Sequence, residues 1–124
     1  MRMNDATDLI LLALEDITKS YGSTLANDAV SLAVRRGHIH AVLGENGAGK
    51  STLMKLIYGV TQPDAGVIRW RGSIVAVKSP AHARALGIGM VFQHFSLFET
   101  MTVLENISLA VPHSPRVLAR MITG

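Results

Sequence analysis

Residues 44–52 read Gly-Glu-Asn-Gly-Ala-Gly-Lys-Ser-Thr, and this stretch decides the fold. It satisfies the phosphate-loop pattern, in which four residues separate two glycines and the second glycine is followed by Lys and Ser or Thr. Glycines let backbone N–H groups surround an anion, while a lysine reaches the β- and γ-phosphates and a serine hydroxyl ligates the accompanying magnesium. The pattern predicts a nucleoside triphosphate site, and the alternative is an ordinary Gly-rich turn before a helix.

The residues around this loop agree with the pattern. The apolar run at residues 38–43 predicts a strand before it, and the apolar residues that follow it recur at helical spacing as far as Gly59 and Pro63. A helix that starts at the loop adds the positive end of its dipole to the anion site. We therefore predict a strand, a phosphate loop and a helix. The residues predicted to bind nucleotide here are Gly44, Asn46, Gly47, Ala48, Gly49, Lys50, Ser51 and Thr52, of which Ser51 would also hold the metal.

The sequence outside this region predicts short strands and two further helices. Residues 9–18 and 29–34 are expected to form an antiparallel pair, and residues 66–71 and 73–77 a hairpin around Gly72. Ser79-Pro80 and Gly87 bound one expected helix, residues 88–92 form another expected strand, and Thr102 with Glu105 is a capping box for a helix to about Ala110. We expect residues 1–8 to be disordered, residues 9–111 to form the domain, and residues 112–124 to be a tail of uncertain structure.

Composition limits the class of protein. The chain has 124 residues, of which 48% are hydrophobic and 17% charged, so it can bury the core of one domain. It contains no cysteine, which excludes disulfides and thiolate metal sites. The net charge of +3 is scattered, so no nucleic acid partner is expected. The strongly apolar stretch near the start, residues 9–14, is too short to span a bilayer, so any membrane contact is expected to be peripheral.

The motif GENGAGKST at residues 44–52 resembles the Walker A motif of ATP-binding cassette (ABC) proteins, and the resemblance extends over residues 11–109. The resemblance implies that Tyr21, in ITKSYG, lies against adenine, and that Gln93, in GMVFQHF, is the Q-loop glutamine that reaches the magnesium and the attacking water. Lys50 and Gln93 would then be the catalytic residues. The alternatives are a half-buried tyrosine at a strand end and a surface glutamine after a strand.

The segments LANDAVSLAVRRG, QPDAGVIRWRG and SPAHARALGIGMVFQHFSLFETMTVLENI narrow the resemblance to the first cassette of tandem ATP-binding subunits of bacterial simple-sugar and nucleoside importers. This implies an α/β fold in which a P-loop NTPase core packs on a small antiparallel β-subdomain. It also implies ATP and Mg²⁺ as cofactors, transmembrane permease subunits and a second cassette as partners, and a cytoplasmic location on the inner face of the membrane.

Several family elements are not found after Gln93. The sequence has no LSGGQ-type signature, no apolar strand ending in an aspartate and a catalytic glutamate, and no switch histidine in its usual context. We therefore expect an incomplete ABC ATPase domain that stops before these motifs and is inactive alone. The missing strand lies beside the phosphate-loop strand in the family, so we also expect a marginally stable, aggregation-prone chain.

Other residues have structural interpretations that we favour. His38 and His40 share one strand face but have no third metal ligand nearby. Trp70 is expected to pack on the hairpin. The cluster Phe92, Phe95, Leu97 and Phe98 fits either a core under the loop or a groove for a permease helix. For function, the alternatives to an importer subunit are a soluble cassette protein acting on the ribosome or DNA, and a remnant that does not hydrolyse ATP.

Overall fold

The computed structural model describes residues 9–92 and 97–110, and it divides into two compact units, residues 1–90 and 91–124. The first unit begins with two long strands, β1 (Ile10–Tyr21) and β2 (Thr24–Arg35), which pair antiparallel from Tyr21 and Thr24 at the turn to Ile10 and Arg35 at the far end. The predicted antiparallel pair is confirmed, and it is longer than the apolar pattern indicated. Irregular register near Asp16 and Ala29, both with positive φ, bends the pair midway.

The sheet continues on the other side of β1. Strands β3 (Ala65–Trp70) and β4 (Ser73–Val75) form the predicted hairpin around Gly72, and the four strands lie in the order β2-β1-β3-β4 with every pair antiparallel. Thr18 of β1 pairs with Ala65 of β3, which brings the chain after the phosphate loop back to the first strand. This sheet is the antiparallel β-subdomain that the resemblance to ABC proteins implies.

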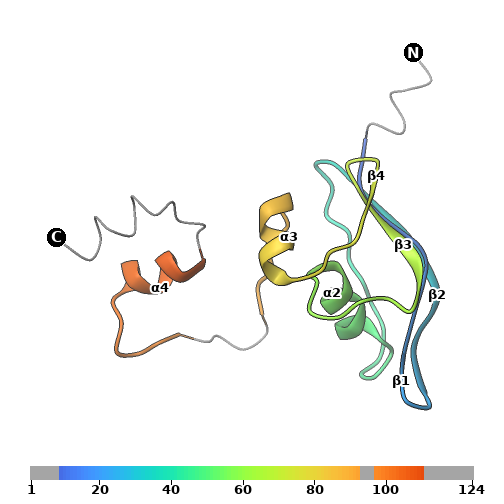
Figure 1. Ribbon diagram of the computed structural model, residues 1–124, viewed down its shortest axis with the longest axis horizontal. Coiled ribbons are helices and arrows are strands. Elements are labelled where there is room, and N and C mark those ends of the chain that lie inside the picture. Colours follow the sequence, from blue (N-terminus) through green and yellow to red (C-terminus); the bar gives the residue numbers. More distant parts are fainter. Residues whose placement is uncertain (1–8, 93–96, 111–124) are drawn as a thin grey trace. The chain divides into compact units, whose positions relative to one another are not determined.

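Helix α2 (Lys50–Ile57) packs on one face of this sheet (Figure 1). Its apolar residues Leu53 and Leu56 join the strand residues Leu14, Ile17 and Ile68 in the main buried cluster. Full burial of one such side chain contributes about 1.5–3 kcal/mol to folding, so this cluster fixes the helix, and the loop before it, on the sheet.

Helix α3 (Pro80–Leu86) follows the hairpin and packs with Tyr58 and Val77 through the fully buried Ala83. Ser79 caps the helix by accepting a hydrogen bond from the His82 N–H, and Gly87 ends it with a left-handed conformation, as predicted. Trp70 lies beside this helix and donates its indole N–H to the Leu86 carbonyl at 2.9 Å, in agreement with a packing role.

The second unit contains α4 (Val103–Ala110), where the predicted capping box is confirmed. The Thr102 hydroxyl accepts a hydrogen bond from the Glu105 N–H, and the Glu105 carboxylate accepts from the Thr102 N–H at 2.7 Å and from its hydroxyl at 2.8 Å. Asn106 ties the preceding loop to this helix through hydrogen bonds to the backbone of Phe98, Met101 and Thr102.

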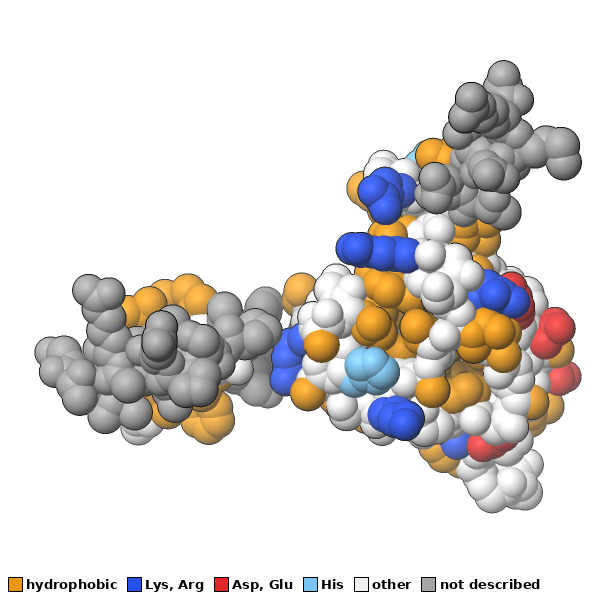
Figure 2. Space-filling view, turned by 45° about the horizontal axis from the view of Figure 1, so that its top comes forward, with side chains coloured by type: hydrophobic (Ala, Val, Ile, Leu, Met, Phe, Trp, Pro, Cys, Tyr) orange, Lys and Arg blue, Asp and Glu red, His pale blue; other side chains and the backbone are white. Residues whose placement is uncertain are grey.

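Two predicted strands are wrong. Residues 38–43 and 88–92 have no strand pairing, and Ile39, Leu43 and Val91 are almost fully exposed. A strand is stabilised by hydrogen bonds to a neighbouring strand, and neither run belongs to the four-stranded sheet of the described residues. Hydrophobic side chains accordingly reach the surface of the first unit, as the orange areas in Figure 2 show.

Some predictions fall outside the described residues: the N-terminal residues 1–8, Gln93, Phe95 and the tail from residue 112. Within the described ranges, no helix is both long and apolar enough to cross a bilayer.

Candidate functional site

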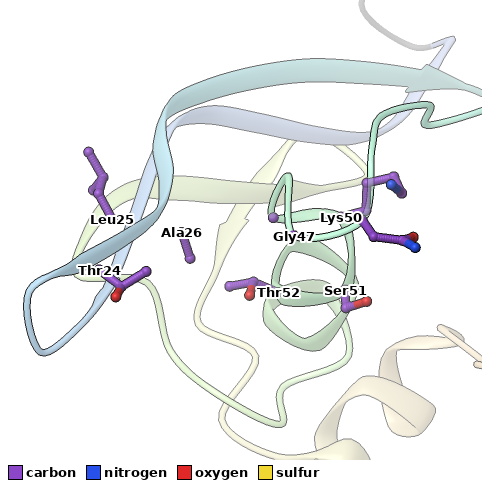
Figure 3. A pocket seen from close by; sticks show the side chains of 9 residues that line it. Thr24, Leu25, Ala26, Gly47, Lys50, Ser51 and Thr52 are labelled. Atoms are coloured by element: carbon purple, nitrogen blue, oxygen red, sulfur yellow. The ribbon is translucent and has the colours of Figure 1, made fainter.

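A cavity of about 370 Å³ lies between the start of β2 and the loop that precedes α2. Figure 3 shows Thr24 and Ala26 of β2 on one side of this cavity, and Gly47, Ser51 and Thr52 on the other. The cavity therefore lies where the start of β2 and the loop before α2 come close together. Its lining residues are Thr24, Leu25, Ala26, Asn46, Gly47, Gly49, Lys50, Ser51 and Thr52.

Gly49 begins the helix at this cavity in a left-handed conformation, with φ of 89°. No side chain caps α2 and no acidic residue lies in its first turn, so the positive end of the helix dipole has no anionic side chain of its own helix against it. The glycine is also required by space, because a Cβ here would lie 2.1 Å from the Ala26 carbonyl oxygen. The Gly49 backbone therefore packs directly against β2.

The Lys50 side chain is hydrogen-bonded to the backbone of the loop. Its ammonium donates hydrogen bonds to the carbonyl oxygens of Gly44 and of Glu45, the latter at 2.8 Å. The loop is closed further by the Ala48 N–H, which donates to the Glu45 carbonyl at 3.1 Å. The Lys50 ammonium therefore lies against two loop carbonyls, and the residue also lines the cavity, where its positive charge favours an anion.

Asn27 ties this loop to β2. It is buried, and its Nδ2 donates to the Gly49 carbonyl at 3.2 Å, while its Oδ1 has no partner. A buried polar atom without a partner destabilises the fold. The packing of Asn27 and its hydrogen bond to the loop must offset this cost. This contact spans 22 residues of sequence and carries no local signal.

Tyr21 lies at the end of β1 and pairs with Thr24, which lines the cavity. Tyr21 as a whole residue is 47% exposed, and the Lys19 ammonium lies 5.4 Å from the centroid of its ring, within cation–π range. Lys19 is in turn paired with Asp64 at 3.0 Å. The hydrogen bond from the Ser20 N–H and the nearby Lys19 hold the pKa of Asp64 below its usual value.

Most of the predicted site residues meet at this cavity. Asn46, Gly47, Gly49, Lys50, Ser51 and Thr52 line it, and Gly44 and Ala48 belong to the same loop without lining it. Tyr21 is one cross-strand pair away. The lining residues from β2 were not predicted, because β2 approaches the loop only through tertiary packing.

No group of three or more His, Cys, Asp or Glu side chains is arranged to hold a metal ion within residues 9–92 and 97–110. His38 and His40 lie in the exposed segment after β2.

The chain is similar to known proteins over most of its length. The family description "ABC transporter" matches residues 27–123. The guanosine import ATP-binding protein NupO of Bacillus subtilis is 52% identical over 99 residues, which cover 80% of this chain and 19% of NupO. The ribose import ATP-binding protein RbsA of a Ruegeria species is 48% identical over 107 residues, which cover 86% of this chain and 21% of RbsA. The chain thus spans about a fifth of the length of these curated relatives.

Solved structures agree with the sequence comparison. A nucleotide-free ATP-binding cassette of an ABC transporter superposes with a TM-score of 0.74 at 36% identity, covering 80% of this chain and 39% of that one. The ADP conformation of MJ1267, also an ABC transporter cassette, has a TM-score of 0.75 at 33% identity, covering 94% and 46%. The α/β fold with its antiparallel sheet is therefore that of part of an ATP-binding cassette, and the chain belongs to the ABC transporter family.

Proposed function

We propose that this chain supplies the nucleotide-binding half of an ATP site that powers import through a membrane permease. The observation that carries the proposal is the uncapped start of α2, which opens with Lys50 and its glycine-rich loop into the cavity beside β2. A Cβ at residue 49 would collide with the Ala26 carbonyl, and the Lys50 ammonium lies against the Glu45 carbonyl of the loop. These features fit a triphosphate, which needs close backbone approach and compensation of its negative charge.

Within this proposal each residue has a distinct part. Lys50 would exchange its contacts with the loop carbonyls for the β- and γ-phosphates, and the amides at the start of α2 would bind phosphate oxygens. Ser51 and Gln93 would hold the magnesium, which neutralises developing charge when bound. Tyr21 would stack on adenine. Gln93 lies outside the described residues, so its part rests on the sequence resemblance alone.

The import role belongs to the whole protein. NupO is named for guanosine import and RbsA for ribose import, which supports a nucleoside or simple-sugar importer. ATP hydrolysis, pairing with a second cassette and attachment to permease subunits at the cytoplasmic face of the membrane follow from the same proposal. Recovery of a permease with the native protein would support it, whereas recovery with ribosomes would favour a soluble cassette protein.

The nucleotide site is tested by Lys50→Ala, with Lys55→Ala on the same helix as the matched control. We expect Lys50→Ala to raise the Kd for Mg-ATP at least about tenfold, because a charge-assisted contact to the phosphates is worth about 1.5–3 kcal/mol. Lys55 does not line the cavity, so its loss should leave the Kd unchanged. Isothermal titration calorimetry measures both. Equal Kd values for the parent and Lys50→Ala, or no binding by the parent, would contradict the proposal.

A further inference from the structure

Asp64 connects the segment after α2 to the end of β1 through three hydrogen bonds. Its own N–H donates to the Thr18 carbonyl at 2.9 Å, and its carboxylate accepts from the Ser20 N–H at 2.8 Å and from the Lys19 ammonium at 3.0 Å. The hydrogen bonds with the backbone of Thr18 and of Ser20 fix the position of the carboxylate relative to β1. Asp64 thus places a negative charge where it holds the Lys19 side chain.

Lys19 lies between Asp64 and the Tyr21 ring. Its side chain is only 14% exposed, and its ammonium is 5.4 Å from the ring centroid. A cation over one face of an aromatic ring is attracted by the ring quadrupole, and it leaves the opposite face for another planar group. Tyr21 is 47% exposed as a residue, so part of its side chain is accessible from solvent.

Tyr21 is the cross-strand neighbour of a residue that lines the cavity. Tyr21 and Thr24 are directly opposite in the antiparallel pair, so their side chains lie on the same face of the sheet, and Thr24 lines the cavity. The phosphate loop lines the other side of that cavity. A ligand with phosphates at the loop and a planar base can therefore meet Tyr21 at the β1–β2 end.

We propose that Asp64 and Lys19 are positioning residues that hold the Tyr21 ring ready to stack on the purine base of a nucleoside triphosphate. The inference rests on the proposed function, since it assigns the base-binding end of the same site. Asp64 acts on Lys19, and Lys19 acts on the ring, so neither needs to touch the nucleotide. The pair would raise affinity for the base without affecting affinity for the phosphates.

The test compares binding of Mg-ATP and of Mg-tripolyphosphate, which has the phosphates but no base. Asp64→Asn removes the charge that holds Lys19 and keeps an oxygen for the Ser20 N–H. We expect it to raise the Kd for Mg-ATP about two- to fivefold, the value of one exposed cation–π contact, and to leave the Kd for Mg-tripolyphosphate unchanged. Glu15→Gln is the matched control, because it removes the other ion-pair carboxylate of this sheet, 2.7 Å from Arg69, and should change neither Kd.

A double-mutant cycle separates positioning from general stability. In a Tyr21→Ala background, Asp64→Asn should have no further effect on Mg-ATP binding, because the ring that it positions is gone. The inference is overturned if Asp64→Asn weakens both ligands equally, if it has no effect on either, or if its effect persists without Tyr21. If the parent binds neither ligand, the proposed nucleotide site itself fails and this inference falls with it.

Discussion

Gly49 is the residue at which the loop and the sheet meet. It combines a left-handed φ of 89° with a separation from the Ala26 backbone too small for any Cβ. Gly47, in the same loop, has a similar φ of 85° but open space where its Cβ would be. Substitution of Gly47 would therefore cost only the strain of the left-handed conformation, whereas substitution of Gly49 would add a steric clash with β2.

We expect Gly49→Ala to lower the free energy of unfolding by about 2–5 kcal/mol, the sum of left-handed strain and forced displacement of β2 or the loop. Gly47→Ala should cost only about 1–2 kcal/mol, from strain alone. Urea denaturation at submicromolar concentration, below the range in which we expect the chain to associate, measures both variants by Trp70 fluorescence. Equal losses would show that the contact with Ala26 is readily relieved and does not seat the loop.

Some residues of the site were predictable from sequence and others were not. The loop residues could be identified because the phosphate-loop pattern is local and its chemistry is specific. The contact of Asn27 with Gly49 spans 22 residues and that of Lys19 with Asp64 spans 45, so nothing in their immediate sequence indicates the partner. Long-range polar contacts of this kind depend on the register of β1 and β2 and on where the chain returns to β1.

Among the helices and strands, the predictions that succeeded depend on residues that lie close together in the sequence. Ser79 and Gly87 bound α3, and Thr102 with Glu105 starts α4, because capping residues bond to backbone groups two or three positions away. Prediction failed at residues 38–43 and 88–92, where apolar composition permits a strand but only a neighbouring strand can stabilise one.

The capping box of α4 predicts a dependence on pH. The Thr102 N–H, followed by its hydroxyl, holds the pKa of Glu105 below its ordinary value of 4.5. A lowered folded-state pKa means that the stabilisation is fully present above 4.5 and is lost as the pH falls through the folded value. Helicity at 222 nm should therefore decrease below pH 4.5 more in the parent than in Glu105→Gln, which cannot titrate. Parallel curves for the two proteins would show that this carboxylate does not stabilise α4.

At the scale of the whole molecule, the exposed apolar residues are the dominant feature. Ile39 and Leu43 are almost fully exposed in the unpaired segment between β2 and the phosphate loop. Unpaired backbone groups next to apolar side chains favour pairing with another chain. We therefore predict that the aggregation expected from the sequence begins at residues 38–43.

We expect the purified chain to associate at micromolar concentration and, because of that association, to unfold at this concentration without a cooperative, reversible thermal transition. Replacing Ile39 and Leu43 together by lysine should reduce this association, since charges on an unpaired segment oppose strand addition. Light scattering and calorimetry measure the two properties. A reversible, cooperative transition of a monomeric parent would contradict the expectation.

The pairing of Thr18 with Ala65 has a consequence for chain entropy. It joins two points 47 positions apart, and closing such a loop costs about 3 kcal/mol beyond a constant. The hairpin of β1 and β2 turns between Tyr21 and Thr24 and has almost no such cost. The entire phosphate loop lies between these two residues, so we expect the hairpin to form first and the loop to be ordered later, when β3 pairs with β1.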